Sequence, residues 1–106
     1  MPNEPFFRID KFKVPTASRD RFTDQLKQTH DALDALTGCE ENMIFEQSEG
    51  PGQFNIVTFV KWRDRACYEE ARKAAQEHQA LSGFDPAAFM ADLGVVPDLG
   101  NYTCLA

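Results

Sequence analysis

The hydrophobic and polar residues of this chain follow two different spacings in turn, which divides it into predicted strands and helices. Residues 6–14, FFRIDKFKV, are typical of a strand, which the following proline ends. In residues 16–38 the apolar side chains recur every three or four positions, and this spacing predicts an amphipathic helix. Thr16 or Ser18 is expected to cap the start of this helix, and Gly38 is expected to end it in a left-handed conformation.

The second half of the chain gives the same kinds of signal, with turn residues between the elements. Paired glycines and a proline predict a turn, and aspartates that precede helical patterns predict helix caps. The predicted elements are a strand around 43–45, a turn at 49–52, a strand at 52–62, a helix over 64–81 that Asp64 caps, a short helix over 86–93 that Asp85 caps, and a final strand over 101–106.

This order of elements predicts an α+β fold of the ferredoxin-like, split βαβ type. Such a fold has a four-stranded antiparallel sheet with its helices on one face, and residues 1–106 are expected to form a single domain. The strand at 52–62 is apolar on both of its faces, although helices can cover only one of them. Val57 and Phe59 point to the uncovered face, so a second copy of the chain is expected to cover it. The sequence therefore predicts a homodimer in which two sheets pack face to face.

Composition and charge narrow the classes of partner. The chain of 106 residues has a net charge of −6 and no basic stripe, which disfavours nucleic acids and anionic membrane surfaces as partners. The sequence has neither a signal-peptide pattern nor an apolar run of membrane-spanning length, so a cytoplasmic protein is expected. The three cysteines are widely spaced and are expected to be reduced and mostly buried.

The candidate chemistry lies on the sheet-facing side of the helix at 64–81. Three of the six residues on that side are alanines, so the helix either approaches the sheet closely or leaves a cavity beside it. The full set is Cys67, Tyr68, Ala71, Ala74, Ala75 and His78. His78 could accept a proton from a phenolic or enolic substrate, or it could be a histidine that only packs. Trp62 and Tyr68 could orient a substrate oxyanion through their N–H and O–H groups, or they could be core aromatics.

Other polar residues have weaker claims to the same pocket. Thr58, Ala71 and Ala75 are expected to line it, and His30 is expected to be a partly exposed packing residue that could line it from the first helix. Asn55 has the opposite parity to Trp62 and is expected to point into the dimer barrel in a structural role. A surface ion pair is the favoured role of Arg19, with contact to a ligand carboxylate as the alternative.

Three segments resemble a known family. They are DKFKVPTASRDRF, GPGQFNIVTFVKW and GFDPAAFMADLGV, and through them the chain resembles the antibiotic biosynthesis monooxygenase-like domains of the dimeric α+β barrel superfamily. The resemblance covers about residues 7–102. It implies a dimeric barrel with a pocket in each subunit, and its members include cofactor-free oxygenases of quinols and anthrones as well as haem-degrading enzymes.

Residue by residue, the resemblance is partial. In the similar quinol oxygenases a tryptophan on this strand and a tyrosine on the next helix hold the substrate, which corresponds to Trp62 and Tyr68. Those enzymes have an asparagine where this chain has Thr58. The haem-degrading members use a first-strand asparagine, where this chain offers Arg8 and Asp10, and a histidine that comes earlier than His78. Haem degradation is therefore disfavoured.

The resemblance, together with these candidate residues, implies a cofactor-independent monooxygenase of a small electron-rich aromatic compound. The sequence has no nucleotide-binding or metal-binding motif, so neither a cofactor nor a metal is expected, and the substrate would supply the electrons. Two alternatives stay open. The chain could be a non-catalytic dimeric module that binds a small apolar ligand, or an isomerase or lyase of a small carbonyl compound that uses the same base.

Overall fold

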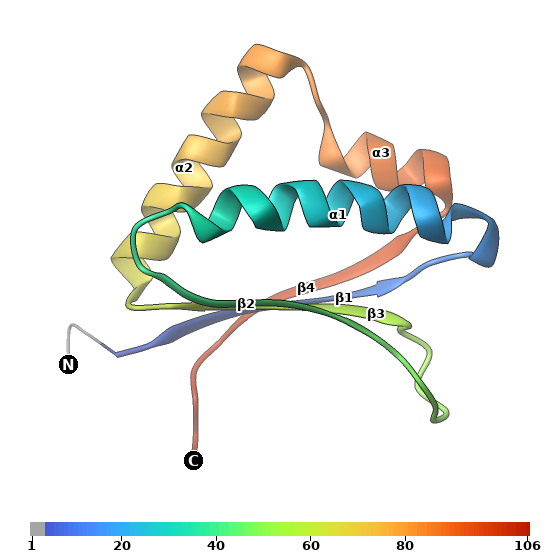
Figure 1. Ribbon diagram of the computed structural model, residues 1–106, viewed down its shortest axis with the longest axis horizontal. Helices are drawn as coiled ribbons and strands as arrows, with labels where there is room; N and C mark the ends of the chain where they lie inside the picture. Colours follow the sequence, from blue (N-terminus) through green and yellow to red (C-terminus); the bar gives the residue numbers. More distant parts are fainter. Residues whose placement is uncertain (1–3) are drawn as a thin grey trace.

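The computed structural model describes residues 4–106 and has three α-helices on one face of a four-stranded antiparallel sheet (Figure 1). The strands lie in the order β2-β3-β1-β4. This arrangement confirms the predicted ferredoxin-like fold. The elements are β1 (Phe6–Lys13), a 3₁₀ turn (Thr16–Ser18), α1 (Arg19–Asp34), β2 (Cys39–Glu46), β3 (Ile56–Trp62), α2 (Arg65–Ser82), α3 (Pro86–Leu93) and β4 (Val96–Tyr102).

The last strand lies five residues earlier than predicted. The sequence indicated 101–106, whereas β4 covers Val96–Tyr102 and pairs along β1. Pro97 lies inside this strand, opposite Phe12. An edge strand tolerates proline because one of its sides needs no hydrogen-bond donors, and β4 is at the edge of the sheet. Cys104 follows the strand and is exposed, Cys39 is half-buried and only Cys67 is buried, so the expectation of mostly buried cysteines is wrong.

The connection between β2 and β3 is longer than predicted, and Asn55 lies at its end. Its Oδ1 accepts a hydrogen bond from the Val14 N–H at 2.8 Å, and its Nδ2 donates to the Val14 carbonyl at 2.9 Å. Asn55 therefore does not point into a dimer barrel as predicted. It precedes β3 where β1 leaves the sheet, and its amide side chain replaces the backbone pairing that ends there.

The helix ends follow capping rules except in α1. This helix ends at Asp34 with Ala35 in a right-handed conformation, so Gly38, although its φ is positive, does not end it as predicted. The Asp64 carboxylate accepts from the Cys67 N–H at 2.9 Å, and the Asp85 carboxylate accepts from two N–H groups in the first turn of α3. Ser18 makes no capping bond, because its hydroxyl donates to the Leu93 carbonyl at 2.7 Å and ties α1 to α3. Among residues 4–106, no helix is long and apolar enough to cross a membrane.

The helices bury the inner face of the sheet as two separate core clusters. One cluster gathers around Trp62 and Tyr68 where α2 begins, and the other gathers around Phe22 and Ile56 under α1 and α3. Between them α2 rises away from the sheet, so that its first turns pack on the strands and its last turns stand clear of them (Figure 1). This departure leaves space above the middle of the sheet.

No helix lies over the outer face of the sheet (Figure 1). The middle of this face is apolar, as the pattern of β3 predicted, and Lys11 and Lys61 lie on the same side. The rings of Phe7 and Phe59 contact each other there, with centroids 5.7 Å apart. Met43 is 40% exposed and Phe45 is 47% exposed, both on the same side of β2. We call this surface the open face; it comprises Phe7, Ile9, Met43, Phe45, Val57 and Phe59.

Candidate functional site

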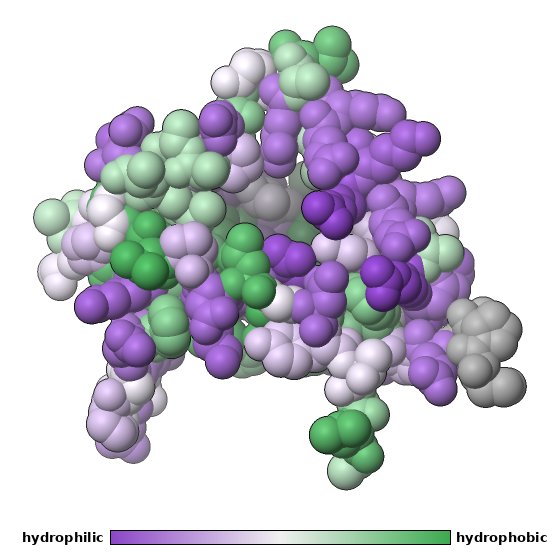
Figure 2. All heavy atoms as spheres, turned by 180° about the vertical axis from the view of Figure 1, so that it is seen from behind, coloured by the Kyte–Doolittle hydropathy of each residue, from purple (hydrophilic) through white to green (hydrophobic). Residues whose placement is uncertain are grey.

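A cavity of about 930 Å³ lies between the inner face of the sheet and the three helices. It occupies the space between the two core clusters, and the molecule is visibly hollowed between α2 and α3 (Figure 2). The alanines of α2 contribute to this space because their side chains reach too short a distance to fill it. All seven residues for which the sequence predicted a site role line the cavity: Thr58, Trp62, Tyr68, Ala71, Ala75, His30 and His78.

Two aromatic residues form the wall of the cavity at the start of α2. Trp62 is 3% exposed, and its ring meets that of Tyr68 edge to face with centroids 6.4 Å apart. Phe6 packs against the other side of Tyr68 at 4.9 Å. The two rings are thus held by packing on several sides, which fixes where the Tyr68 hydroxyl lies.

The hydroxyl of Tyr68 belongs to a hydrogen-bond network on the cavity floor. Nη1 of Arg8 donates to the Tyr68 oxygen at 3.1 Å and to Oδ1 of Asn101 at 3.1 Å, while Nε donates to Asp10 at 2.7 Å. A guanidinium can only donate, so the Tyr68 oxygen must be the acceptor. The Tyr68 O–H is therefore available to donate to another group in the cavity.

Asp10 holds the Arg8 side chain in this position. Its carboxylate also accepts from the Gly100 N–H at 3.3 Å, which ties the network to β4. Burial raises the pKa of Asp10, and the positive charge of Arg8 opposes that rise. An ion pair in a largely apolar cavity is the arrangement that such burial requires.

Sequence reasoning missed Arg8 and Asp10 as site residues, although a signal was present. They share the inward parity of β1 with Phe6 and Phe12, which are both buried. Two charged residues on the buried side of a strand need a partner or a water-accessible cavity. Here they have both, since they pair with each other and line the cavity.

His30 is buried, at 9% exposed, instead of partly exposed as predicted. Its Nδ1 is hydrogen-bonded to Oδ1 of Asn42, and Nδ2 of Asn42 donates to the His30 backbone carbonyl at 2.6 Å. Asn42 lies on the inward side of β2, so its hydrogen bonds to His30 hold this end of α1 against the sheet. The helical pattern placed His30 near the edge of the apolar stripe and gave no sign of this partner.

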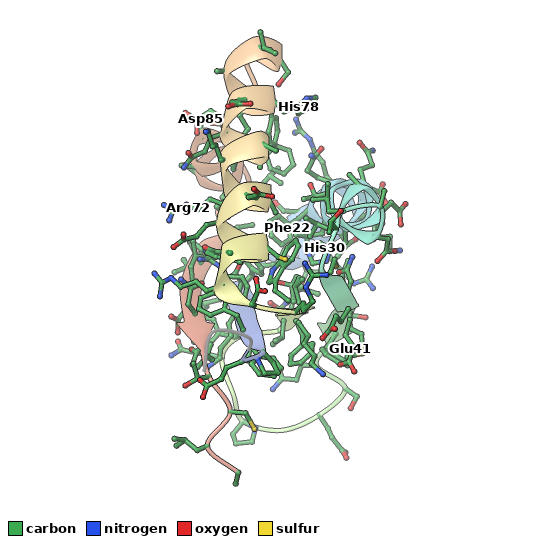
Figure 3. The ribbon with its side chains drawn as sticks, turned by 90° about the vertical axis from the view of Figure 1, so that its left-hand side faces the viewer. Phe22, His30, Glu41, Arg72, His78 and Asp85 are labelled. Atoms are coloured by element: carbon green, nitrogen blue, oxygen red, sulfur yellow. The ribbon has the colours of Figure 1, made fainter. Side chains whose placement is uncertain are left out.

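His78 lines the cavity but lies far from the aromatic wall. It is ten residues beyond Tyr68 on α2, which corresponds to about 15 Å along the helix axis. In Figure 3 His78 stands in the upper part of α2, whereas His30 lies below it, close to the sheet. His78 is exposed because α2 has left the sheet by this point. The structure therefore does not bring His78 together with Trp62 and Tyr68.

Arg19 lies outside the cavity and forms the predicted surface pair. Its guanidinium contacts the carboxylates of Glu46 and Asp20, the latter at 2.8 Å. The hydrogen bond from Arg19 lowers the pKa of Glu46. The contact is exposed and tethers α1 to the end of β2, which is a structural role.

Comparisons with known proteins agree with this fold. One match is a variant of SnoaB, a cofactor-independent oxygenase from Streptomyces nogalater, with 15% identity, 97% of this chain and 95% of that chain covered, and a TM-score of 0.68. A dimeric ferredoxin-like protein from an uncultured marine organism matches with 11% identity, 96% of both chains covered and a TM-score of 0.72. A haem-degrading protein from Mycobacterium tuberculosis matches with 12% identity, 96% and 92% coverage and a TM-score of 0.61.

At these identities the structural likeness establishes the fold alone. No curated protein matches the chain in sequence. The family model for antibiotic biosynthesis monooxygenases matches residues 5–82, which include β1, β2, β3 and α2 and so most of the cavity wall. The chain belongs to the antibiotic biosynthesis monooxygenase family.

Proposed function

We propose that this protein is a cofactor-independent monooxygenase that oxidises a small electron-rich aromatic compound, such as a quinol or an anthrone, in the cavity between sheet and helices. The observation that carries the proposal is the Tyr68 hydroxyl, which accepts from Arg8 and keeps its own proton for a ligand in an apolar cavity. Membership of the monooxygenase family supports the reaction class.

The cavity suits such a substrate in size and in polarity. A volume of about 930 Å³ is within the range of small-molecule sites, and apolar side chains form most of the wall. Trp62 and Tyr68 would stack against or edge onto an aromatic ring. Arg8 would act through Tyr68, because its positive charge makes the tyrosine hydroxyl a stronger donor to a substrate oxyanion.

The reaction follows from these groups. A base removes a proton from the substrate, and Tyr68 donates to the oxygen on which negative charge develops. The substrate anion then reduces O2, and a new carbon–oxygen bond forms. For an anthrone, the CH2 group becomes a carbonyl, one oxygen atom of O2 enters the product and the other leaves as water. All the electrons come from the substrate, so the step needs no further reductant.

The functional unit in this proposal is a homodimer formed through the open face. The open face carries apolar side chains across β1, β2 and β3, and such a patch is rarely left in water. Packing against a second copy would bury it on both chains. A protein of the same fold is described as dimeric, which is consistent with this arrangement.

The test is oxygen uptake by the purified protein with a panel of anthrones and 1,4-dihydroxynaphthalenes. The rate in the absence of protein is subtracted, since these compounds also oxidise on their own. Tyr68→Phe keeps the ring contacts with Phe6 and Trp62 but removes the donor, and kcat should fall about 100-fold. Tyr102→Phe is the matched control, since Tyr102 lies outside the cavity and is 41% exposed.

The outcomes separate the proposal from its alternatives. Saturable binding without oxygen uptake would identify a ligand-binding module, and conversion of a compound without oxygen uptake would identify an isomerase or a lyase. Equal activity of Tyr68→Phe and the wild type would show that the Tyr68 hydroxyl does not stabilise the reacting oxygen.

A further inference from the structure

We propose that His30 is the proton acceptor of this cavity and that Asn42 is a positioning residue, which holds the His30 ring with the lone pair of Nε2 available to a ligand. This inference rests on the proposed function for its catalytic meaning, but its structural content can be tested without turnover. It assigns the base to a residue on α1, instead of to His78 on α2.

The hydrogen bonds around Asn42 determine which ring nitrogen carries the proton. Nδ2 of Asn42 faces two groups that can only accept, the His30 carbonyl at 2.6 Å and Oδ1 of Asp34 at 3.1 Å. The NH2 end of the amide must therefore point to them, and the oxygen end must face Nδ1 of His30. An amide oxygen cannot donate, so Nδ1 carries the proton and Nε2 of the neutral ring is the acceptor.

The strand register places this acceptor opposite the Tyr68 donor. Asn42 and Arg8 both pair with Val60, from opposite sides of β3. Strands lie about 4.8 Å apart, so the backbones of these two residues are about 10 Å apart across the floor. His30 is held over Asn42, and Tyr68 is bonded to Arg8. A substrate ring that lies over Val60 can therefore present a proton to Nε2 of His30 on one side and an oxygen to the Tyr68 hydroxyl on the other.

The charged neighbours of His30 are consistent with a proton acceptor. Asp34 faces Asn42 from the end of α1, and Asp10 and Arg8 line the cavity from β1. Burial raises the pKa of Asp10, and the positive charge of Arg8 opposes that rise. A protonated His30 would also lower the pKa of Asp10, so the Asp10 carboxylate would in turn favour the imidazolium that proton transfer creates.

The tautomer can be observed directly, because the chain has only two histidines. In a protein labelled with ¹⁵N-histidine, His78→Gln leaves a single ring to assign to His30. We expect the neutral His30 ring to be protonated at Nδ1 alone in the wild type. Asn42→Leu should allow the proton to move to Nε2. Asn101→Leu is the control: Asn101 lies opposite Arg8 on β4, at the far edge of the sheet from Asn42, and its loss should leave the tautomer unchanged. An Nε2-protonated ring in the wild type would overturn the proposal.

Proton transfer can be tested with 4-nitrophenol, whose phenolate absorbs at a longer wavelength than the phenol. We expect the wild type and His78→Gln to bind it with an increase in phenolate absorbance, and His30→Gln to show none. An increase that survives His30→Gln but is lost in His78→Gln would overturn the proposal, as would the lack of any increase with the wild type.

The same variants keep this inference separable from the proposed reaction. With a compound that the wild type oxidises, His30→Gln should lower kcat about 100-fold or more. If no compound is oxidised but the nitrophenol result holds, the proposed function fails and the proton acceptor stands. If compounds are oxidised equally by His30→Gln and the wild type, the proton acceptor fails and the proposed function stands.

Discussion

Truncation of Phe45 on the open face should weaken the proposed dimer by an amount that the structure allows us to estimate. A fully buried phenylalanine side chain contributes about 2.5 kcal/mol, and Phe45 is 47% exposed, so about 1.2 kcal/mol remains to be gained at an interface. In a two-fold dimer the residue occurs twice, which gives about 2.4 kcal/mol for Phe45→Ala. The dimer dissociation constant should therefore rise about 50-fold.

Sedimentation equilibrium over a range of protein concentrations measures this constant. Phe45→Glu should weaken the dimer further, because two carboxylates would have to be buried without partners. Leu81→Glu is the matched control, since Leu81 is 90% exposed near the end of α2, away from the open face. A monomeric wild type, or a dimer that Phe45→Glu leaves intact, would refute the assignment of the open face as the interface.

Three further predictions concern the fold. Gly38→Ala should lower the free energy of unfolding in urea by about 2–4 kcal/mol, because φ is +84° and the new Cβ would lie 2.5 Å from Sγ of Cys67. Gly83→Ala is the control: its φ is also positive but the space around it is open, so it should lower the free energy of unfolding by only about 1–2 kcal/mol. Asp85→Ala should cost about 1 kcal/mol by removing the α3 cap, and Asp85→Asn should cost less. The hydrogen bond from the Cys67 N–H lowers the pKa of Asp64. The Asp64 carboxylate therefore stabilises the fold fully above its ordinary pKa of 3.8, and this contribution is lost as the pH falls through the lower pKa of the folded state. The difference in free energy of unfolding between the wild type and Asp64→Ala should shrink as the pH falls, and a constant difference would contradict this.

The fold could be predicted where local chemistry and the spacing of apolar residues agree. The helix predicted over 64–81 is observed as Arg65–Ser82, since an aspartate begins it and a glycine with positive φ ends it. The final strand was misplaced because Pro97 and Gly100 make residues 96–102 resemble a loop. What keeps them extended is pairing with β1, which is distant in the sequence.

The candidate site was predictable only in part, for a related reason. The stripe of α2 correctly gave residues that line a cavity, because periodicity defines which side of a helix faces inward. The hydrogen bond between His30 and Asn42 joins α1 to β2, and the bond between Arg8 and Tyr68 joins β1 to α2. Neither has a local signature, since each depends on how a helix is placed over the sheet.

The spacing of apolar residues also does not give the angle between a helix and a sheet. This angle decides which histidine lies near Tyr68 and Arg8. His78 has the right parity on α2, but each turn carries it about 5.4 Å further along a helix that is leaving the strands. The inward parity of β1 was the better guide, because burial of a charge without a partner is costly. Arg8 and Asp10 form an ion pair between two buried phenylalanines of β1. A proton acceptor is better placed beside this ion pair than among the alanines of α2. His30 is the histidine that the sheet itself holds in that position, through Asn42.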